Sequence, residues 1–345
     1  MHSFDNSTRR IGFACKFAEI NKKGEISSVE GLNTGGTTLA WARRNSRSKV
    51  EEKIMDVAKQ NIMNTHNLVK KVATLPEPLR MLRITSDMLS FYTHEDYTDF
   101  WQSTDVQNNL ERWMAPIGET ARKNNVRLSF HPDQFCCVAS DSDAIVSKSI
   151  EELEYHASMA RWMGYGKSKL DFKINVHLSG RRKSLGLDLI WNRISPELRN
   201  CLTLENDEYQ TGLDDLIKLG NKVGIVLDIH HHFIHTGEYI QSNDDRIKKV
   251  VDSWQGVRPT IHYSISREEY LPNHDTNVLP NLNLLVESGI NKQKLRAHSD
   301  YMWSIAANDW AKTHWEWADV MVEAKSKNLA SFKLFEYWEG LKMQS

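Results

Sequence analysis

The stretch from residue 201 to residue 235 reads CLTLENDEYQTGLDDLIKLGNKVGIVLDIHHHFIH, and it holds two short apolar runs separated by a helical pattern. The first run, residues 201–204, is followed directly by Glu205. The second run, residues 224–229, contains Asp228 near its end. A strand, a helix and a second strand in this order predict two parallel strands joined by a helical crossover.

The same alternation extends in both directions along the chain. The apolar runs that we interpret as strands are residues 11–15, 81–85, 126–130, 172–176, 201–204, 224–229, 259–263 and 319–322. The segments with the clearest helical spacing are residues 51–72, 145–163 and 211–219. Eight parallel strands that alternate with helices are the number that closes a barrel. The sequence therefore predicts an α/β fold, a TIM (β/α)₈ barrel, as a single domain over residues 1–345.

The composition excludes several classes of protein. No run approaches the roughly 18 apolar residues that a membrane-spanning helix needs, so we expect no membrane association. Eleven Trp, ten Tyr and eleven Phe residues exclude a disordered chain. A net charge of −1 excludes a polycation that coats DNA. The four cysteines show no CxxC spacing and the first residues lack the layout of a signal peptide, which predicts a cytoplasmic protein.

Imidazole or carboxylate side chains follow most of the predicted strands. They are His131, His177, Glu205, Asp228, His262 and Glu323 near strand ends, with His231 three residues beyond Asp228 and His298 in the long segment 266–309. Taken singly, each has a structural hydrogen bond as its alternative, and we expect His230 and His232 to belong in part to an exposed loop. Taken together at one barrel mouth, they predict a site for several divalent ions. Mixed imidazole and carboxylate ligands without thiolates favour Zn²⁺ or Mn²⁺.

Such a site suits the hydrolysis of a phosphodiester. Two ions about 3.5–4 Å apart can activate a water and stabilise the leaving oxygen. The chain has no GxSxG motif, no P-loop and no dinucleotide-binding fingerprint. The sequence therefore indicates hydrolysis without a covalent nucleophile.

The motifs around these residues resemble, in order, those of the UV damage endonucleases. They are IGFAC at 11–15, HPDQF at 131–135, VHLSG at 176–180, LENDE at 204–208, DIHH at 228–231, RAHSD at 296–300 and VEAK at 322–325. The resemblance extends from the first predicted strand to the last. It implies an endonuclease that nicks duplex DNA immediately 5′ to a cyclobutane pyrimidine dimer or a 6-4 photoproduct, with abasic sites as lesser substrates.

The resemblance also implies a set of metal ligands and catalytic residues. The ligand positions carry over to His131, His177, Glu205, Asp228, His231, His262, His298 and Glu323, with Glu205, Asp228 and Glu323 as catalytic carboxylates. One ion is expected on His131, His177 and a bridging Glu205, a second on Glu205, Asp228, His262 and Glu323, and a third on His231 and His298. The expected cofactor is Mn²⁺, two or three ions, with Zn²⁺ or Mg²⁺ as alternatives.

Two positions depart from the family pattern. Members can carry a lysine two residues before the seventh-strand histidine, where this chain has Thr260, so the third ion is in question. The lesion-probing residues correspond to Gln134, Phe135 and Phe13, with phenylalanine in place of the usual tyrosines. An aromatic ring and an amide can fill the stack from which a damaged pair is extruded. Barrel core is the alternative for both phenylalanines.

DNA binding requires positive charge, which is concentrated in residues 31–50 and 167–183. The second stretch includes Lys173, Arg181 and Arg182, and we expect the two arginines to contact phosphates at the barrel mouth. Ordinary solvated side chains are the alternative. The expected partner is damaged double-stranded DNA, bound by a monomer.

Three other functions compete with this hypothesis. The first is an apurinic/apyrimidinic endonuclease with the same barrel and similar ligands. The second is a sugar isomerase on the same fold, which would not need basic loops. The third is a non-catalytic protein that binds lesions without nicking the DNA.

Overall fold

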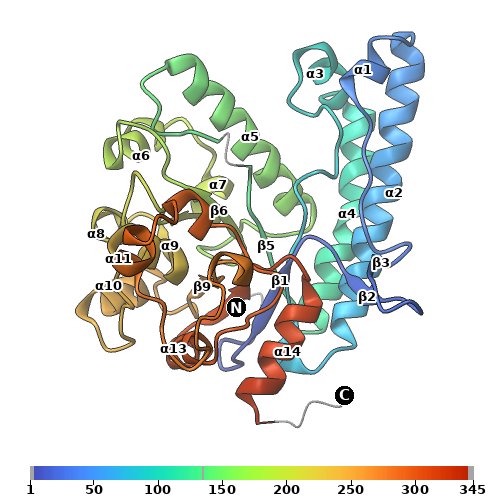
Figure 1. Cartoon of the computed structure of the whole chain (residues 1–345). Coiled ribbons are helices and arrows are strands. Elements are labelled where there is room, and N and C mark those ends of the chain that lie inside the picture. Colours follow the sequence, from blue (N-terminus) through green and yellow to red (C-terminus); the bar gives the residue numbers. More distant parts are fainter. Residues whose placement is uncertain (1–3, 134–135, 341–345) are drawn as a thin grey trace.

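The computed structural model describes residues 4–133 and 136–340, and a parallel barrel is at its centre (Figure 1). Within these ranges, eight parallel strands close in the order β1, β10, β9, β8, β7, β6, β5, β4 and back to β1. They are β1 (Ile11–Ala14), β4 (Met81–Arg83), β5 (Arg127–Phe130), β6 (Lys173–His177), β7 (Leu202–Glu205), β8 (Gly224–Asp228), β9 (Thr260–Tyr263) and β10 (Asp319–Val322). All eight predicted runs form these strands, and the TIM barrel is confirmed.

Helices surround the barrel. The α-helices are α1 (Leu39–Ala42), α2 (Arg47–Ala73), α3 (Thr98–Trp101), α4 (Thr104–Lys123), α5 (Asp143–Trp162), α6 (Ser184–Ile190), α7 (Pro196–Cys201), α8 (Leu213–Leu216), α9 (Ile229–Thr236), α10 (Asp245–Ser253), α11 (Leu282–Glu287), α12 (Lys292–Leu295), α13 (Ile305–His314) and α14 (Asn328–Trp338). Short 3₁₀ turns cover Glu77–Leu79, Glu95–Tyr97, Ile217–Leu219 and Glu268–Tyr270. Figure 1 shows α2 and α4 side by side along one flank of the barrel. No helix in the described ranges combines the length and apolar composition needed to cross a bilayer.

A small antiparallel hairpin, β2 (Ala18–Ile20) and β3 (Ile26–Ser28), follows β1 and was not among the predicted strands. Each strand has three residues and most of its surface is exposed. The hairpin therefore lacks the buried alternate side chains that make a strand visible in a sequence. Asn328 at the start of α14 fastens it to the barrel, since its side chain exchanges hydrogen bonds with the backbone of Ala18 at 2.7 and 3.0 Å.

Phe13 lies in the layer between the barrel and α14. The ring has no exposed surface and makes edge contacts with Phe17 and Phe332, with ring centroids 5.7 and 6.4 Å apart. Side chains alternate between the two faces of a strand, and Phe13 takes the outer face of β1, toward the helix that carries Phe332. The structure therefore supports the core alternative for Phe13, because a ring enclosed there does not reach a DNA duplex at the barrel mouth.

Candidate metal centre at the barrel mouth

Imidazole and carboxylate side chains gather where the strands end. They are His177 at the end of β6, Glu205 at the end of β7, Asp228 at the end of β8, His262 within β9, and His131 and Glu323 directly after β5 and β10. Parallel strands of a closed barrel end at one mouth. Six strands therefore each place one imidazole or carboxylate at the same mouth of the barrel.

Glu205 lies at the centre of this cluster and has no exposed surface. Its Oε1 lies 3.0 Å from Nδ1 of His262, and its Oε2 lies 3.1 Å from Nε2 of His131. Asn175, on the same face of β6 as His177, donates a hydrogen bond to Oε2. Each carboxylate oxygen therefore faces a different imidazole, the arrangement in which one carboxylate can serve two neighbouring ions.

Among the described residues, three groups bring their candidate ligand atoms within 4.8 Å of one another. The groups are His131, Glu205 and His262; His177, Glu205 and His231; and Asp228, His262 and Glu323. Glu205 and His262 belong to two groups each. Two neighbouring ions could share the Glu205 carboxylate, whereas His262 can bind one of them, because its Nε2 faces Lys173 and Nδ1 alone faces the cluster.

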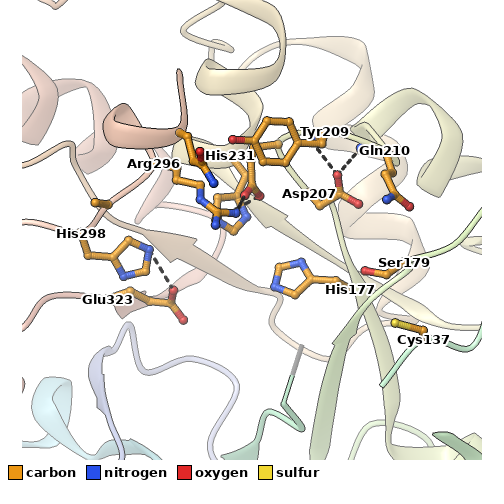
Figure 2. Close-up of a pocket in the computed structure, with 13 residues that line it drawn as sticks. Cys137, His177, Ser179, Asp207, Tyr209, Gln210, His231, Arg296, His298 and Glu323 are labelled. Atoms are coloured by element: carbon orange, nitrogen blue, oxygen red, sulfur yellow. Dashed lines mark hydrogen bonds and ion pairs between the residues drawn. The ribbon is translucent and has the colours of Figure 1, made fainter. Parts of the chain in front are cut away.

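Asp228, His262 and Glu323, which the resemblance implied on one ion, fall in one group, and the rest of the grouping differs from the implied one. His131 and His177 were expected on one ion, yet they fall in different groups although their ring centroids are 5.2 Å apart. His231 groups with Glu205 and not with His298. His298 instead lies on the cavity wall, with Nε2 3.8 Å from Oε2 of Glu323 (Figure 2). The register around the closed barrel, which the order of motifs does not reveal, decides which strand ends face each other.

Burial and neighbouring charges shift the pKa values of the cluster in opposite directions. Burial acts to raise the pKa of Glu205, but the imidazoles of His262 and His177 outweigh it and hold this pKa well below its ordinary value. Burial raises the pKa of Asp228 well above its ordinary value, and the nearby carboxylates add to this. Burial lowers the pKa of His262 to about 4. This direction favours the uncharged form of His262, the form in which imidazole binds a metal ion.

The donor atoms fit a divalent cation. Among the described residues, Oδ2 of Asp228 and Nδ1 of His177 are buried polar atoms without a hydrogen-bond partner. Asp228 uses its other oxygen, Oδ1, to cap α9, accepting hydrogen bonds from the backbone N–H groups of His230 and His231 at 2.8 and 2.7 Å. Buried polar atoms are costly to leave unpaired. Nitrogen and oxygen donors without thiolates suit ions such as Zn²⁺ or Mn²⁺.

Three carboxylates lie within 4 Å of the His231 ring nitrogens, those of Glu205, Glu208 and Asp228. Burial acts to lower the pKa of His231, but the carboxylates of Asp228, Glu205 and Glu208 outweigh it and raise this pKa to about 9. Such surroundings attract cations.

The LENDE segment does more than form a solvated loop. Asn206 exchanges two hydrogen bonds with the backbone of Asp228, both at 2.9 Å, which ties the end of β7 to the end of β8. The carboxylate of Asp207 accepts a hydrogen bond from the backbone N–H of Tyr209 at 2.7 Å. Glu208 lies 3.9 Å from Nε2 of His231 and pairs with Arg296 at 2.6 Å. We did not predict these roles of Asn206, Asp207 and Glu208 from the sequence, although the three residues directly follow the predicted ligand Glu205.

Two basic residues at the site were also missed. Arg83, the last residue of β4, has 16% of its side chain exposed and forms an ion pair with Glu323. Lys173, the first residue of β6, places Nζ 3.0 Å from Nε2 of His262. Lys173 belongs to the basic stretch 167–183 that the sequence predicts to face DNA, but it shares the inner face of β6 with Asn175 and lies inside the barrel. Burial lowers the pKa of Lys173 to about 7.

An open cavity of about 770 Å³ lies above the cluster (Figure 2). Its lining includes His177, His231, His298, Glu323, Tyr209 and Arg296. The loop after β6 contains Gly180, which has a φ of +128° and lies close to Ala139. No larger residue fits there, because a Cβ would lie 2.2 Å from the Ala139 carbonyl. This contact fastens the loop after β6 to the segment that follows residue 135.

The predicted DNA contacts have different outcomes. Gln134 and Phe135 lie outside the described residues. Arg181 is 92% exposed on the loop after β6, 3.9 Å from Asp141. Arg182 instead donates hydrogen bonds to the backbone carbonyl of Asp141 at 2.9 Å and to Asp143 at 3.1 Å. Arg181 is therefore available to a phosphate, whereas Arg182 fastens the loop to the start of α5.

His230 and His232 are not in an exposed loop, as we had expected, but are buried on α9. Nε2 of His230 lies 3.1 Å from the carbonyl oxygen of Leu295, and Nε2 of His232 lies 3.0 Å from Oε2 of Glu238. Their structural hydrogen bonds leave His231, between them, as the histidine of this run that faces the cluster.

The fold and the site define a TIM-barrel protein with a cluster of candidate metal ligands at the carboxyl-terminal mouth. Residues 9–344 match the model of the UV-endonuclease UvdE family, so the chain belongs to that family and the resemblance is confirmed. It is 26% identical over 313 residues to a "UV DNA damage endonuclease" of Bacillus velezensis, covering 87% of each chain. It is 28% identical over 301 residues to a "UV-damage endonuclease" of Schizosaccharomyces pombe, covering 84% of this chain and 45% of the yeast protein.

A solved structure supports the fold. The crystal structure titled SacUVDE superposes with a TM-score of 0.70 at 20% sequence identity, covering 96% of this chain and 98% of that one. The overall barrel fold is therefore shared with that protein.

Proposed function

We propose that this protein is a metal-dependent endonuclease that nicks duplex DNA immediately 5′ to a UV photoproduct. Its proposed substrates are cyclobutane pyrimidine dimers and 6-4 photoproducts, with abasic sites as lesser substrates. The observation that carries the proposal is the cluster around Glu205 at the mouth of a barrel that belongs to the UV-endonuclease family. The names of the bacterial and yeast relatives support the same activity.

The proposed cofactor is two or three divalent ions, with Mn²⁺ preferred and Zn²⁺ or Mg²⁺ as alternatives. Their proposed ligands are the eight predicted side chains. They are His131, His177, Glu205, Asp228, His231, His262, His298 and Glu323. Divalent ions bound there lower the pKa of water and stabilise the charge that develops on a phosphodiester. Glu205, Asp228 and Glu323 supply the catalytic carboxylates. Arg83 holds Glu323 in place through their ion pair.

The surroundings of the cluster also suit the binding of a DNA duplex. The cavity above the cluster is open, and Arg181 stands exposed on the loop that follows His177. A guanidinium at this rim is suited to a backbone phosphate. A monomer acting in the cytoplasm stays our prediction.

Nicking of irradiated plasmid tests the proposed function. Supercoiled plasmid that has been UV-irradiated is expected to become open-circular with protein and Mn²⁺, and to stay supercoiled when EDTA removes the ions. Plasmid that has not been irradiated is the control for lesion dependence. Binding of irradiated plasmid without any nicking would instead support a lesion-binding protein, and nicking confined to plasmid with abasic sites would support an apurinic/apyrimidinic endonuclease.

Gln134→Ala is expected to reduce discrimination between lesion and undamaged DNA by about tenfold, because an amide that pairs with orphaned bases is worth about 1–3 kcal/mol. The ratio of kcat/KM for dimer-containing and undamaged duplexes measures this. The amount of metal bound per molecule of the variant is expected to be unchanged, and this measurement is the control for folding. An unchanged ratio would remove Gln134 from the lesion-probing role.

A further inference from the structure

Arg296 lies on the wall of the open cavity above the cluster of candidate ligands (Figure 2). It directly follows α12, and its side chain is 41% exposed. Its Nη1 donates a hydrogen bond to Oε1 of Glu208 at 2.6 Å. The guanidinium also packs over the ring of Tyr209, with its central carbon 5.5 Å from the ring centroid. One nitrogen and one face of the guanidinium are therefore engaged.

The other two nitrogens of Arg296 are open to a ligand. In the described part of the chain, Nε and Nη2 form no hydrogen bond with another residue. A guanidinium presents its N–H donors in one plane, and a pair of them can bind two oxygens of one phosphate. Because Arg296 lines the cavity, a phosphate that enters there meets a guanidinium with donors to spare.

The two partners of Arg296 are themselves fixed. The backbone of Tyr209 is held by Asp207, whose carboxylate accepts its N–H at 2.7 Å. The Tyr209 ring is half exposed and its hydroxyl has no hydrogen-bond partner among the described residues, so packing against Arg296 is its main contact. Glu208 lies between Arg296 and His231, with Oε2 3.9 Å from Nε2 of the histidine. The guanidinium is therefore held in place one side chain away from a candidate metal ligand.

A similar arrangement at the opposite end of the barrel shows that position distinguishes Arg296. Arg9 precedes β1, lies over the ring of Trp315 at 4.8 Å and pairs with Glu316 at 2.7 Å. The strands of a parallel barrel begin at this end, away from the mouth. Glu316 is 69% exposed, whereas Glu208 is 9% exposed at the cavity. The two arginines thus have the same kinds of partner, but Arg296 alone of the pair stands beside the cluster.

We propose that Arg296 binds a backbone phosphate of the DNA next to the metal centre, and that Glu208 and Tyr209 hold its guanidinium in the orientation that receives this phosphate. The inference rests on the proposed function, because it requires a duplex at the cavity. It extends the DNA contacts from Arg181, after β6, to the segment between β9 and β10.

Arg296→Met tests the proposal through the salt dependence of DNA binding. The affinity for a dimer-containing duplex is measured in EDTA over a range of KCl concentrations. The variant is expected to bind about tenfold more weakly at about 0.1 M KCl, and the slope of log K against log[KCl] is expected to become shallower by about 0.9, the value for one phosphate contact. An unchanged slope overturns the proposal even if the affinity falls, because a residue that only holds Glu208 in place releases no counterions.

Arg9→Met is the matched control and is expected to leave both affinity and slope unchanged. An equal change of slope in Arg9→Met would indicate a general effect of charge and would also overturn the proposal. Tyr209→Ala decides the outcome if Arg296→Met does not fold, since it leaves the ion pair of Arg296 in place. Its affinity is expected to fall about two- to fivefold, as for loss of an exposed cation–π contact, and Tyr209→Phe is expected to restore it. Unaltered affinity in Tyr209→Ala would then count against the proposal.

The same slopes can be measured on an undamaged duplex, because counterion release depends on phosphates and not on the lesion. Unsubstituted protein that binds both duplexes but nicks neither would contradict the proposed function. The slopes of the variants would still decide whether Arg296 contacts a phosphate.

Discussion

Glu205→Gln is expected to lower the rate of nicking on the order of 10³-fold or more while leaving lesion binding intact. Glu205 is the buried carboxylate whose two oxygens face His262 and His131, and it belongs to two of the three candidate ligand groups. Glutamine keeps the shape but removes the negative charge. It also presents an N–H group where a cation would need an oxygen, so two ion positions are weakened at once.

Two measurements separate the effect on nicking from the effect on binding. The first is the single-turnover nicking rate on a dimer-containing duplex, and the second is the affinity of the protein for the same duplex in EDTA. Glu151→Gln makes the same change at an exposed position on α5 and should leave both measurements unchanged. Full nicking activity in Glu205→Gln would exclude a bridging role. Equal losses of binding and nicking would indicate that the substitution had disturbed the barrel mouth as a whole.

Asp319→Asn is expected to destabilise the protein by about 3–5 kcal/mol, because it removes the charge that compensates buried guanidinium groups. Asp319, the first residue of β10, is fully buried. Its Oδ2 lies 2.7 Å from Arg127 and 3.6 Å from Arg10, and its Oδ1 accepts a hydrogen bond from Nε of Arg258 at 2.9 Å. Burial lowers the pKa of Arg127 to about 10, and the Asp319 carboxylate acts in the opposite direction by favouring the charged guanidinium.

Urea unfolding followed by circular dichroism measures this effect. Glu316→Gln is the matched control, since Glu316 pairs with Arg9 at 2.7 Å but is exposed, and exposed pairs contribute less than about 1 kcal/mol. A loss below 1 kcal/mol in Asp319→Asn would contradict the prediction. It would mean that the backbone carbonyls that accept hydrogen bonds from these arginines suffice to hold them.

The barrel was predictable because each strand is short, apolar and followed by a polar residue and a helix. These are local properties, and the run from Gly224 to Asp228 displays all of them. The hairpin β2–β3 was missed because its strands are exposed, and α9 was misjudged because three consecutive histidines look polar. The burial of His230 and His232 depends on acceptors at Leu295 and Glu238, of which the first is distant in the chain.

The barrel, the family and the strand-end positions of the candidate ligands can all be inferred from the amino-acid sequence. Three features became visible in the folded barrel alone: His262 faces Glu205, Phe13 lies outside the barrel wall, and Lys173 lies inside it. The physical reason is that alternation and strand ends are set by neighbouring residues. Contacts across a closed barrel depend instead on the register of all its strands, so a lysine that reads as a surface charge becomes the partner of a histidine three strands away.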